Sequence, residues 1–219
     1  MASATGERAR AVNPATERGR GRGGLKQERA LRTRAQVLGA AAQAFADKGF
    51  PAVTMLDVAE LTGMTKGAVY FHYPNKEALA LAVTEEFYHR IARIGEEVLG
   101  LELSPLDAVT ELMTRTAVAF RDDLVVQAGA RLQIESTLIA TDLPRPYVGY
   151  TELVTGWLAQ AAEIGELPAG ARPEAIARVL ISAFFGAQHI SWVLDNRSDV
   201  AERVQEILST VLPAGKSAA

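Results

Sequence analysis

Hydrogen-bond donors gather between residues 54 and 76 in a pattern suited to holding phosphate oxygens. Hydroxyl, ammonium, phenol and imidazole groups of this kind are the usual donors to the DNA backbone, together with N–H groups at helix N-termini. Lys66 can also reach a guanine edge, and Ala68 is small enough to touch a thymine methyl group. The candidate DNA-contacting residues are Thr54, Thr65, Lys66, Gly67, Ala68, Tyr70, His72 and Lys76.

The spacing around these donors predicts a helix-turn-helix. Thr54 and Asp57 have the spacing of a capping box at the start of a short helix. Gly63 supplies the positive φ that a tight turn needs, and a second short helix follows over residues 65–72. Val58, Leu61, Met64 and Val69 are expected to share a core with a preceding helix over about 30–48, which ends at Lys48-Gly49. We therefore predict a three-helix head over residues 28–75.

The charge distribution supports a head that faces phosphates. The net charge is -3, but residues 1–76 carry 12 Lys/Arg against 6 Asp/Glu, and the rest of the chain carries 11 against 20. Only the face that meets phosphates needs positive charge, so a basic head on an acidic body fits this asymmetry. Residues 1–27 are rich in Gly, Arg and Ala and are expected to be a disordered basic arm. That arm either extends into a neighbouring minor groove or has no specific role.

Composition excludes several other classes of protein. The chain has no cysteine, which rules out a disulfide scaffold, a thiolate zinc finger and a cysteine nucleophile. Its three histidines lie far apart, and the glycines at 19–24 match a dinucleotide motif without the βαβ unit that such a site needs. We expect no catalytic residues, no metal and no cofactor. No apolar run reaches the roughly 18 residues that span a bilayer, and no secretory signal is recognised, so we expect a cytoplasmic protein without membrane contact.

The remainder of the chain, residues 76–219, is predicted to be a helical body. Asn75 is expected to cap a long helix that runs to about residue 100. The spacing of apolar residues, Pro and Gly predicts further helices near 104–121, 124–140, 146–164, 173–192 and 199–211. No alternating β-branched run interrupts them, so the fold class is all-α.

Polar residues on apolar helix faces mark a candidate effector cavity in this body. Gln133 has small helical neighbours, Gly129 and Ala130 among them, which leave room for a ligand. Tyr88 lies beside an apolar stripe of the long helix, and Tyr147 and Tyr150 begin the helix after a Pro-Arg-Pro loop. The candidate effector-binding residues are Tyr88, Gln133, Tyr147 and Tyr150. The two tryptophans, Trp157 and Trp192, are expected in the core or in an interface.

Residues 65–79, TKGAVYFHYPNKEAL, resemble the signature of the TetR family of repressors, and the likeness extends back to about Arg32. The resemblance implies a homodimer on a palindromic operator, with the last two helices pairing in a four-helix interface. The apolar face expected there consists of Val179, Leu180, Ala183, Phe184, Gly186 and Ala187, extended by Ile190, Trp192, Val193, Val204, Ile207, Leu208 and Val211. A core role within one chain is the alternative for this face.

Residues 65–71 and 124–132 resemble most closely the γ-butyrolactone-receptor group of filamentous actinobacteria, and within it the receptors of the methylenomycin furans. The resemblance implies a ligand that is a hydroxymethyl-furan carboxylic acid or a butyrolactone, and control of antibiotic biosynthesis. Butyrolactone receptors usually have a tryptophan where this chain has Tyr150, and the tyrosine hydroxyl suits a more polar ligand. Met113, Ala117 and Phe120 share one helix face and are expected to hold an alkyl tail. The alternative function is an architectural DNA-binding protein that takes no ligand.

Overall fold

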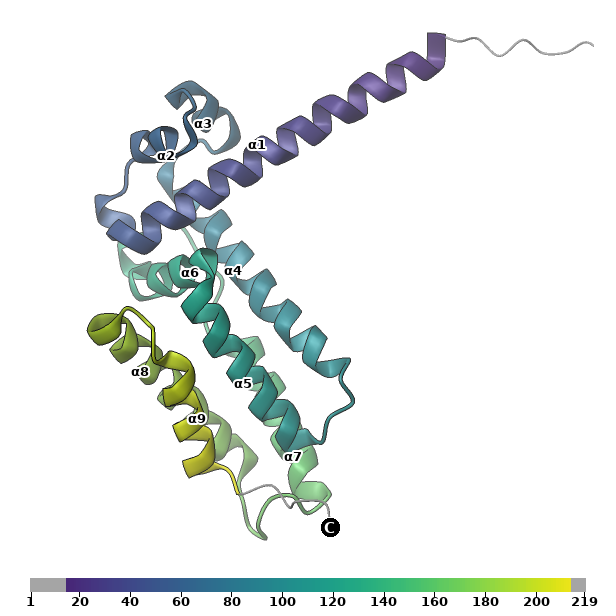
Figure 1. The fold of residues 1–219 in the computed structure, drawn as a ribbon, viewed down its shortest axis with the longest axis vertical. Helices are drawn as coiled ribbons and strands as arrows, with labels where there is room; N and C mark the ends of the chain where they lie inside the picture. The colour runs from purple at the N-terminus through teal and green to yellow at the C-terminus, as the bar shows by residue number, and fades with distance from the viewer. Residues whose placement is uncertain (1–14, 214–219) are drawn as a thin grey trace, which may run out of the picture.

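The computed structural model describes residues 15–213 of the chain, with side chains described from residue 27 onward. Within that range the chain is all helical (Figure 1), which confirms the predicted fold class. The elements are α1 (Ala15–Ala52), α2 (Met55–Thr62), α3 (Lys66–His72), α4 (Lys76–Leu99), α5 (Pro105–Asp122), α6 (Leu124–Ile134), the 3-10 turn η1 (Ser136–Leu138), α7 (Val148–Glu163), α8 (Pro173–Asp195) and α9 (Val200–Val211).

Helices α1, α2 and α3 form the head at the top of Figure 1. The capping box at the start of α2 is present, since the Thr54 side chain accepts from Asp57 N and the Asp57 side chain accepts from Thr54 N. Gly63 has a φ of 67° in the turn between α2 and α3, as the sequence predicts. Val58 and Val69 are fully buried, but Leu61 is 48% exposed. The prediction that Leu61 joins the head core is therefore wrong, because α2 turns that side chain outward.

Helix α1 begins far earlier than the sequence predicts. It starts at Ala15 and projects beyond the head (Figure 1), so the prediction of an arm without helix is wrong for residues 15–27; residues 1–14 lie outside the described part. Arginine, alanine, leucine, glutamine and glutamate all favour a helix, and here they outweigh the interspersed glycines. The predicted stop at Lys48-Gly49 is present as a kink, at which Gly49 has a φ of 76° and a ψ of 166°.

The body is a bundle of helices that hangs below the head. Helix α4 descends from the head, and Asn75 caps its start by accepting from Ala78 N at 2.7 Å. Helix α6 lies at the junction, where it packs against both α1 and α4. The helix predicted over 124–140 is shorter than expected: α6 ends at Ile134, and a loop after η1 leads to α7. Side chains from α5, α7 and α8, including Phe120, Leu158 and Phe184, fill the core between the helices.

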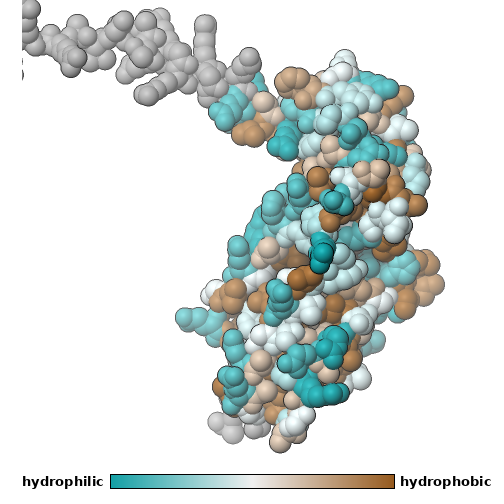
Figure 2. Space-filling view, turned by 180° about the vertical axis from the view of Figure 1, so that it is seen from behind, coloured by the Kyte–Doolittle hydropathy of each residue, from teal (hydrophilic) through white to brown (hydrophobic). Residues whose placement is uncertain are grey.

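Helix α8 is, among the described helices, the one long and apolar enough in composition to cross a membrane. It packs against α7 and α9, and Ala177, Leu180 and Phe184 on its inner side are buried, as in a core helix of a folded domain. Its outer side is apolar and exposed at Val179, Ile190, Val193 and Leu194. Apolar residues also reach the surface elsewhere on the body, scattered among polar ones (Figure 2).

The face expected to form an interface is therefore divided by the structure. Leu180 and Phe184 on α8 face inward and are almost fully buried, as are Val204 and Leu208 on α9, so the assignment of these four residues to an interface is wrong. Val179, Gly186, Ile190 and Val193 face outward, with Ala183 and Ala187 half-buried at the edge. Trp157 is buried in the core, which is one of the two locations predicted for it. The helical period places only every third or fourth residue on one side, which separates the two sets.

Candidate functional site

Helix α3 presents a short, exposed surface on the head. Thr65 caps the helix by accepting from Ala68 N at 3.3 Å, and Val69 anchors it in the core. Lys66, Gly67 and Tyr70 are exposed, and the Lys66 ammonium lies 5.7 Å from the centre of the Tyr70 ring. Gly67 has open space where a side chain would begin. This face can therefore approach another molecule closely and offer it hydrogen-bond donors.

Two of the predicted DNA-contacting residues already have hydrogen-bond partners inside the chain. Lys76 donates to the carbonyl oxygen of Phe50 at 2.8 Å and lies 4.2 Å from the centre of the Phe50 ring. Thr54 is occupied by the capping box, in which its hydroxyl lies 2.6 Å from Asp57 Oδ2. Asp57 also pairs with Lys48 at 2.5 Å, and these hydrogen bonds hold the pKa of the Asp57 carboxyl far below its usual value. Both residues thus hold the head together, whatever else they contact.

The sequence analysis missed one residue of this surface. Phe71 is 83% exposed, more than any other large apolar side chain of the described residues, and its ring meets His72 edge-on at 5.3 Å. His72 itself is half-buried. Helical periodicity could have indicated Phe71. Val69 in α3 and Tyr73 just after it lie on the buried side, and Phe71 lies on the opposite side.

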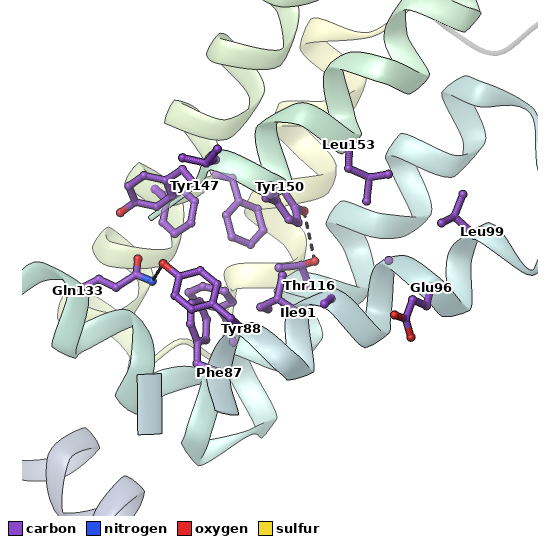
Figure 3. Close-up of a pocket in the computed structure, with 17 residues that line it drawn as sticks. Phe87, Tyr88, Ile91, Glu96, Leu99, Thr116, Gln133, Tyr147, Tyr150 and Leu153 are labelled. Atoms are coloured by element: carbon purple, nitrogen blue, oxygen red, sulfur yellow. Dashed lines mark hydrogen bonds between the residues drawn. The ribbon is translucent and has the colours of Figure 1, made fainter. Parts of the chain in front are cut away.

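The four predicted effector residues surround one cavity of the body. Tyr88, Gln133, Tyr147 and Tyr150 come from α4, α6, and the start of α7, and all line a cavity of about 410 Å³ (Figure 3). Apolar residues make up most of the remaining wall. They are Phe87, Ile91, Ala92, Gly95, Leu99, Phe120, Val148, Gly149, Leu153, Phe184 and Phe185, with Thr116 and Glu96 as the further polar members.

Four of the polar side chains of the cavity form two hydrogen-bonded pairs. The Gln133 amide donates to the Tyr88 hydroxyl, which in turn lies 3.5 Å from the Pro144 carbonyl oxygen. The Tyr150 hydroxyl donates to Thr116 Oγ1 at 3.2 Å (Figure 3). Burial raises the pKa of Tyr88 to about 12 and the pKa of Tyr150 further still. All of these groups are thus neutral, and they offer hydrogen bonds to a ligand without offering charge.

Two expectations about the cavity wall are wrong. Met113 and Ala117 are fully buried in the core and do not line the cavity, whereas Phe120 does. The small residue Gly129 leaves no room for a ligand, because a Cβ there would lie 2.3 Å from Phe87 Cβ. The ring of Phe87 from α4 occupies that space. A helical pattern shows which residues share a face but not which neighbouring helix fills the gap.

Helix α6 contacts both the cavity and the head. Arg131 donates to the Ala46 carbonyl oxygen at 2.8 Å, and Glu135 accepts from Phe50 N at 2.6 Å. The two side chains also pair with each other at 3.0 Å. We call this ion pair and its contacts the α6 clamp. Gln133 lies between the two clamp residues in the sequence and lines the cavity, so a change at the cavity can reach the end of α1 through one short helix.

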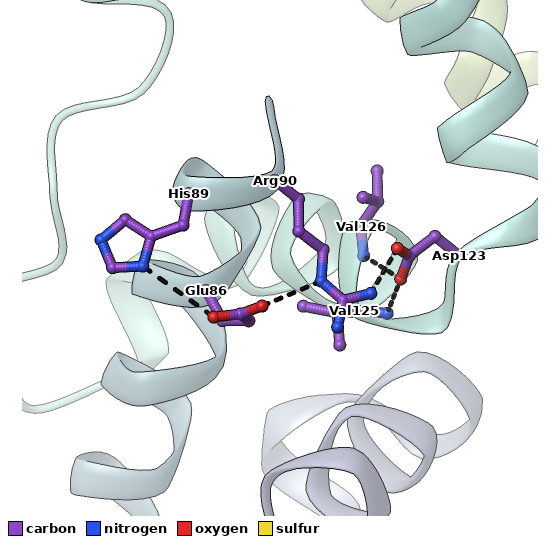
Figure 4. A network of polar contacts seen from close by, with 6 residues as sticks. All are labelled: Glu86, His89, Arg90, Asp123, Val125 and Val126. Atoms are coloured by element: carbon purple, nitrogen blue, oxygen red, sulfur yellow. Dashed lines mark hydrogen bonds and ion pairs between the residues drawn. The ribbon is translucent and has the colours of Figure 1, made fainter. Parts of the chain in front are cut away.

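A second polar network fixes the other end of α6. Arg90 on α4 contacts both Glu86 and Asp123, and Asp123 caps α6 by accepting from Val125 N at 2.8 Å (Figure 4). His89 lies 3.9 Å from Glu86 at the exposed edge of this network. Asp123 begins the helix and Glu135 follows its last residue. Helix α6 is thus tied to α4 at its start and to α1 at its end.

Comparison with known proteins places these features among bacterial regulators. The family described as bacterial regulatory proteins, tetR family, matches residues 37–83. The A-factor receptor protein of Streptomyces griseus is 30% identical over 189 residues, which is 86% of this chain and 66% of that receptor. The chain likewise spans only about half of the regulator ArpR of Pseudomonas putida, 49% of its length, at 36% identity.

Solved structures are similar over a larger share of their length. One, reported as the molecular basis for control of antibiotic production by bacterial hormones, is 50% identical, with a TM-score of 0.76 over 82% of this chain and 95% of that one. The TetR regulator TylP of Streptomyces fradiae is 30% identical, with a TM-score of 0.60 over 85% of this chain and 82% of that one. The likeness therefore covers head and body together.

Proposed function

Because the chain belongs to the TetR family of bacterial regulatory proteins, a family of transcriptional regulators and not of enzymes, we propose that it is a repressor released from DNA by a small signalling molecule. The observation that carries this proposal is the cavity of about 410 Å³, lined mostly by apolar side chains with a few hydrogen-bonding groups. A purely architectural DNA-binding protein needs no such cavity. The protein would act in the cytoplasm, where its DNA lies.

The head would bind duplex DNA through α3. Thr65, Lys66 and Tyr70 lie on its exposed face, and the small residues Gly67 and Ala68 let the backbone approach base edges. A single short helix contacts too few bases for strong selectivity, so two copies would bind a palindromic operator. The exposed apolar side chains of α8, Val179, Ile190 and Val193, are the surface on which the second copy would pack.

The signalling molecule would be of the hydroxymethyl-furan-carboxylate or butyrolactone type, and the regulated genes would serve antibiotic production. The likeness to the A-factor receptor, and to a solved structure reported for the control of antibiotic production by bacterial hormones, supports a signalling ligand and a role in antibiotic production. The cavity supports it as well, because the pairs Tyr88–Gln133 and Tyr150–Thr116 suit a small oxygenated ring, and the apolar wall near Leu99 suits an alkyl tail.

Release would follow from a conformational difference between the DNA-bound and ligand-bound states. A ligand that draws Gln133 toward itself shifts α6, and the α6 clamp passes the shift to the end of α1. Helix α4 would tilt in the same change, since Tyr88 contacts Gln133 and Lys76 contacts Phe50. The recognition helices then leave the spacing of successive major grooves, roughly 34–36 Å. Ligand and DNA weaken each other's binding by the same factor.

The proposal is tested by titrating the full chain on its operator with a furan carboxylate and with a butyrolactone. Calorimetry measures ligand binding, and a gel-shift series measures DNA affinity with and without saturating ligand. We expect at least one ligand class to bind and to lower DNA affinity. The variant Gln133→Ala should bind the ligand more weakly and keep its affinity for DNA. Operator affinity that stays constant at saturating ligand would reject the switch.

A further inference from the structure

Trp192 on α8 contacts the α6 clamp from the body. The guanidinium of Arg131 lies 5.2 Å from the centre of the indole ring, and the same side chain donates to the Ala46 carbonyl oxygen on α1. Trp192 itself is half-buried. Its neighbours Ile190 and Val193 lie on the exposed side of α8, where a second copy would pack under the proposed function. Through this ring the clamp thus joins the head to the helix that would form the dimer.

A second arginine lies against the same ring. Arg197 has its guanidinium 4.7 Å from the centre of the Trp192 ring and belongs to the turn between α8 and α9, at the end of the body nearest the head (Figure 1). The residue is 3% exposed, and among the described residues its Nε atom has no hydrogen-bond partner. A buried cation usually pairs with a carboxylate. Within the described part of the chain Arg197 forms no ion pair, so its charge stays uncompensated there.

The backbone holds Arg197 in this place at a cost. Arg197 has a φ of 67° and follows the cap residue Asn196, whose φ is 48°. Its N–H donates to the Ser191 carbonyl oxygen at 3.0 Å and so closes the end of α8. Glycine is the usual residue at this position, because the left-handed region is costly for a residue with a side chain. An arginine here indicates a role of the side chain that offsets the strain.

The two guanidinium groups oppose each other at the ring. Because both lie against one indole, their charges are no farther apart than the sum of the two distances to its centre. Glu135 pairs with Arg131 at 3.0 Å, but Arg197 has no such partner among the described residues. Burial, with the nearby Arg131 charge, lowers the pKa of Arg197 to about 10, which leaves it charged at neutral pH. Like charges repel more strongly where water is excluded. Each arginine therefore weakens the contact of the other with Trp192.

We propose that Trp192 is a positioning residue for DNA binding and that Arg197 opposes it. Trp192 holds Arg131, and with it the α6 clamp, in the arrangement that fixes the head relative to α8. Arg197 competes for the ring and so favours the arrangement in which Arg131 has left it. This proposal rests on the proposed function and adds the residues that set the balance between the DNA-bound and the released state. A smaller difference in effector affinity between the two states is then enough to release DNA.

The test uses the full chain and the duplex that it selects from a pool of random sequences. Gel shifts measure affinity for that duplex, sedimentation measures self-association, and thermal unfolding measures stability. Trp192→Leu should lower the affinity about tenfold, within the range for a partly buried cation–π contact. Trp192→Phe should lower it less, since it keeps an aromatic ring. Arg197→Met should instead raise the affinity about threefold, although loss of a positive charge ordinarily weakens binding to DNA.

A double variant identifies the ring as the point of competition. In the Trp192→Leu background, Arg197→Met should change the affinity by less than about twofold, because the arginines no longer share a ring. Arg172→Met is the matched control, since it removes an exposed arginine at the start of α8. It should leave the affinity within about twofold of that of the unaltered chain.

Three outcomes overturn the proposal. One is an Arg197→Met protein whose affinity is unchanged or lower, and another is a gain that persists in the double variant. The third is a Trp192→Leu protein that loses affinity only in proportion to lost self-association or stability, because Trp192 would then be an interface or core residue. If the unaltered chain selects no duplex at all, the proposed DNA-binding function fails, and the role of Trp192 fails with it.

Discussion

The kink at Gly49 offers a direct test of the contact between head and body. Gly49 has a φ of 76° and a ψ of 166°, a region that is costly for residues with a side chain. A Cβ added there would lie 2.4 Å from Glu135 Oε1 and 2.6 Å from Arg131 Nη2. The substitution Gly49→Ala therefore forces both strain in the backbone and withdrawal of the α6 clamp.

The expected loss of stability follows from these two costs. Backbone strain of this kind costs about 1–3 kcal/mol. The clamp makes two charge-assisted hydrogen bonds to the main chain, at 2.8 Å and 2.6 Å, each worth about 1.5–3 kcal/mol when fully lost. The clamp side chains are long enough to retain part of these contacts. We expect Gly49→Ala to lower the free energy of unfolding by about 2–5 kcal/mol, within the range of severe single substitutions.

Urea denaturation followed by circular dichroism measures this change. The matched control is Gly39→Ala on the same helix, where a Cβ meets nothing within 4 Å. That control should stabilise the protein by about 0.5–1 kcal/mol, because alanine favours a helix interior. A Gly49→Ala protein within about 0.5 kcal/mol of the unaltered one would refute the reasoning, since it would mean that the clamp and the kink contribute little.

Three further predictions concern the head and the cavity wall. Phe71→Ala should lower operator affinity about tenfold in a gel shift, as expected for losing the burial of an exposed phenylalanine ring, without changing the melting temperature. Unchanged affinity would place the ring outside the DNA interface. The depressed pKa of Asp57 means that its ionised carboxylate stabilises the fold above the usual carboxyl pKa, and this contribution is lost as the pH falls below that value. Asp57→Asn should therefore flatten the acid side of the plot of stability against pH. An identical plot would contradict the pairing with Lys48. Gly129→Ala should destabilise the protein by about 1–3 kcal/mol in thermal unfolding, because the new Cβ collides with Phe87 Cβ, and a neutral effect would show that α4 and α6 move apart at little cost.

Local patterns in the sequence were sufficient to predict the caps and the turn of the head. The capping box at Thr54, the turn at Gly63 and the cap at Asn75 each depend on residues within four positions of one another, and all three are present as predicted. The same reasoning was wrong for Leu61, because which side of a short helix is covered depends on what packs against it. It also missed Phe71, which becomes notable only once the buried side of α3 is known.

Only part of the effector cavity could be predicted from local sequence patterns. Polar residues on apolar faces drew attention to Tyr88 and Gln133, which lie 45 positions apart in the sequence and form a hydrogen bond in the structure. The reason offered for room beside Gln133 was wrong, because Phe87 fills the space next to Gly129. Thr116 and Phe185 were missed, since their place in the wall depends on how three helices cross.

The sequence by itself determined the caps and turns of the head, the all-α class and the set of polar residues from which a site could be built. These features follow from short-range spacing, because capping, turns and amphipathic faces involve neighbours along the chain. Only the tertiary structure decided that the Tyr147 and Phe185 rings meet edge-on in the cavity wall and that the Arg131–Glu135 pair holds the kink at Gly49. Such contacts join distant segments, and the packing of the whole chain sets their geometry.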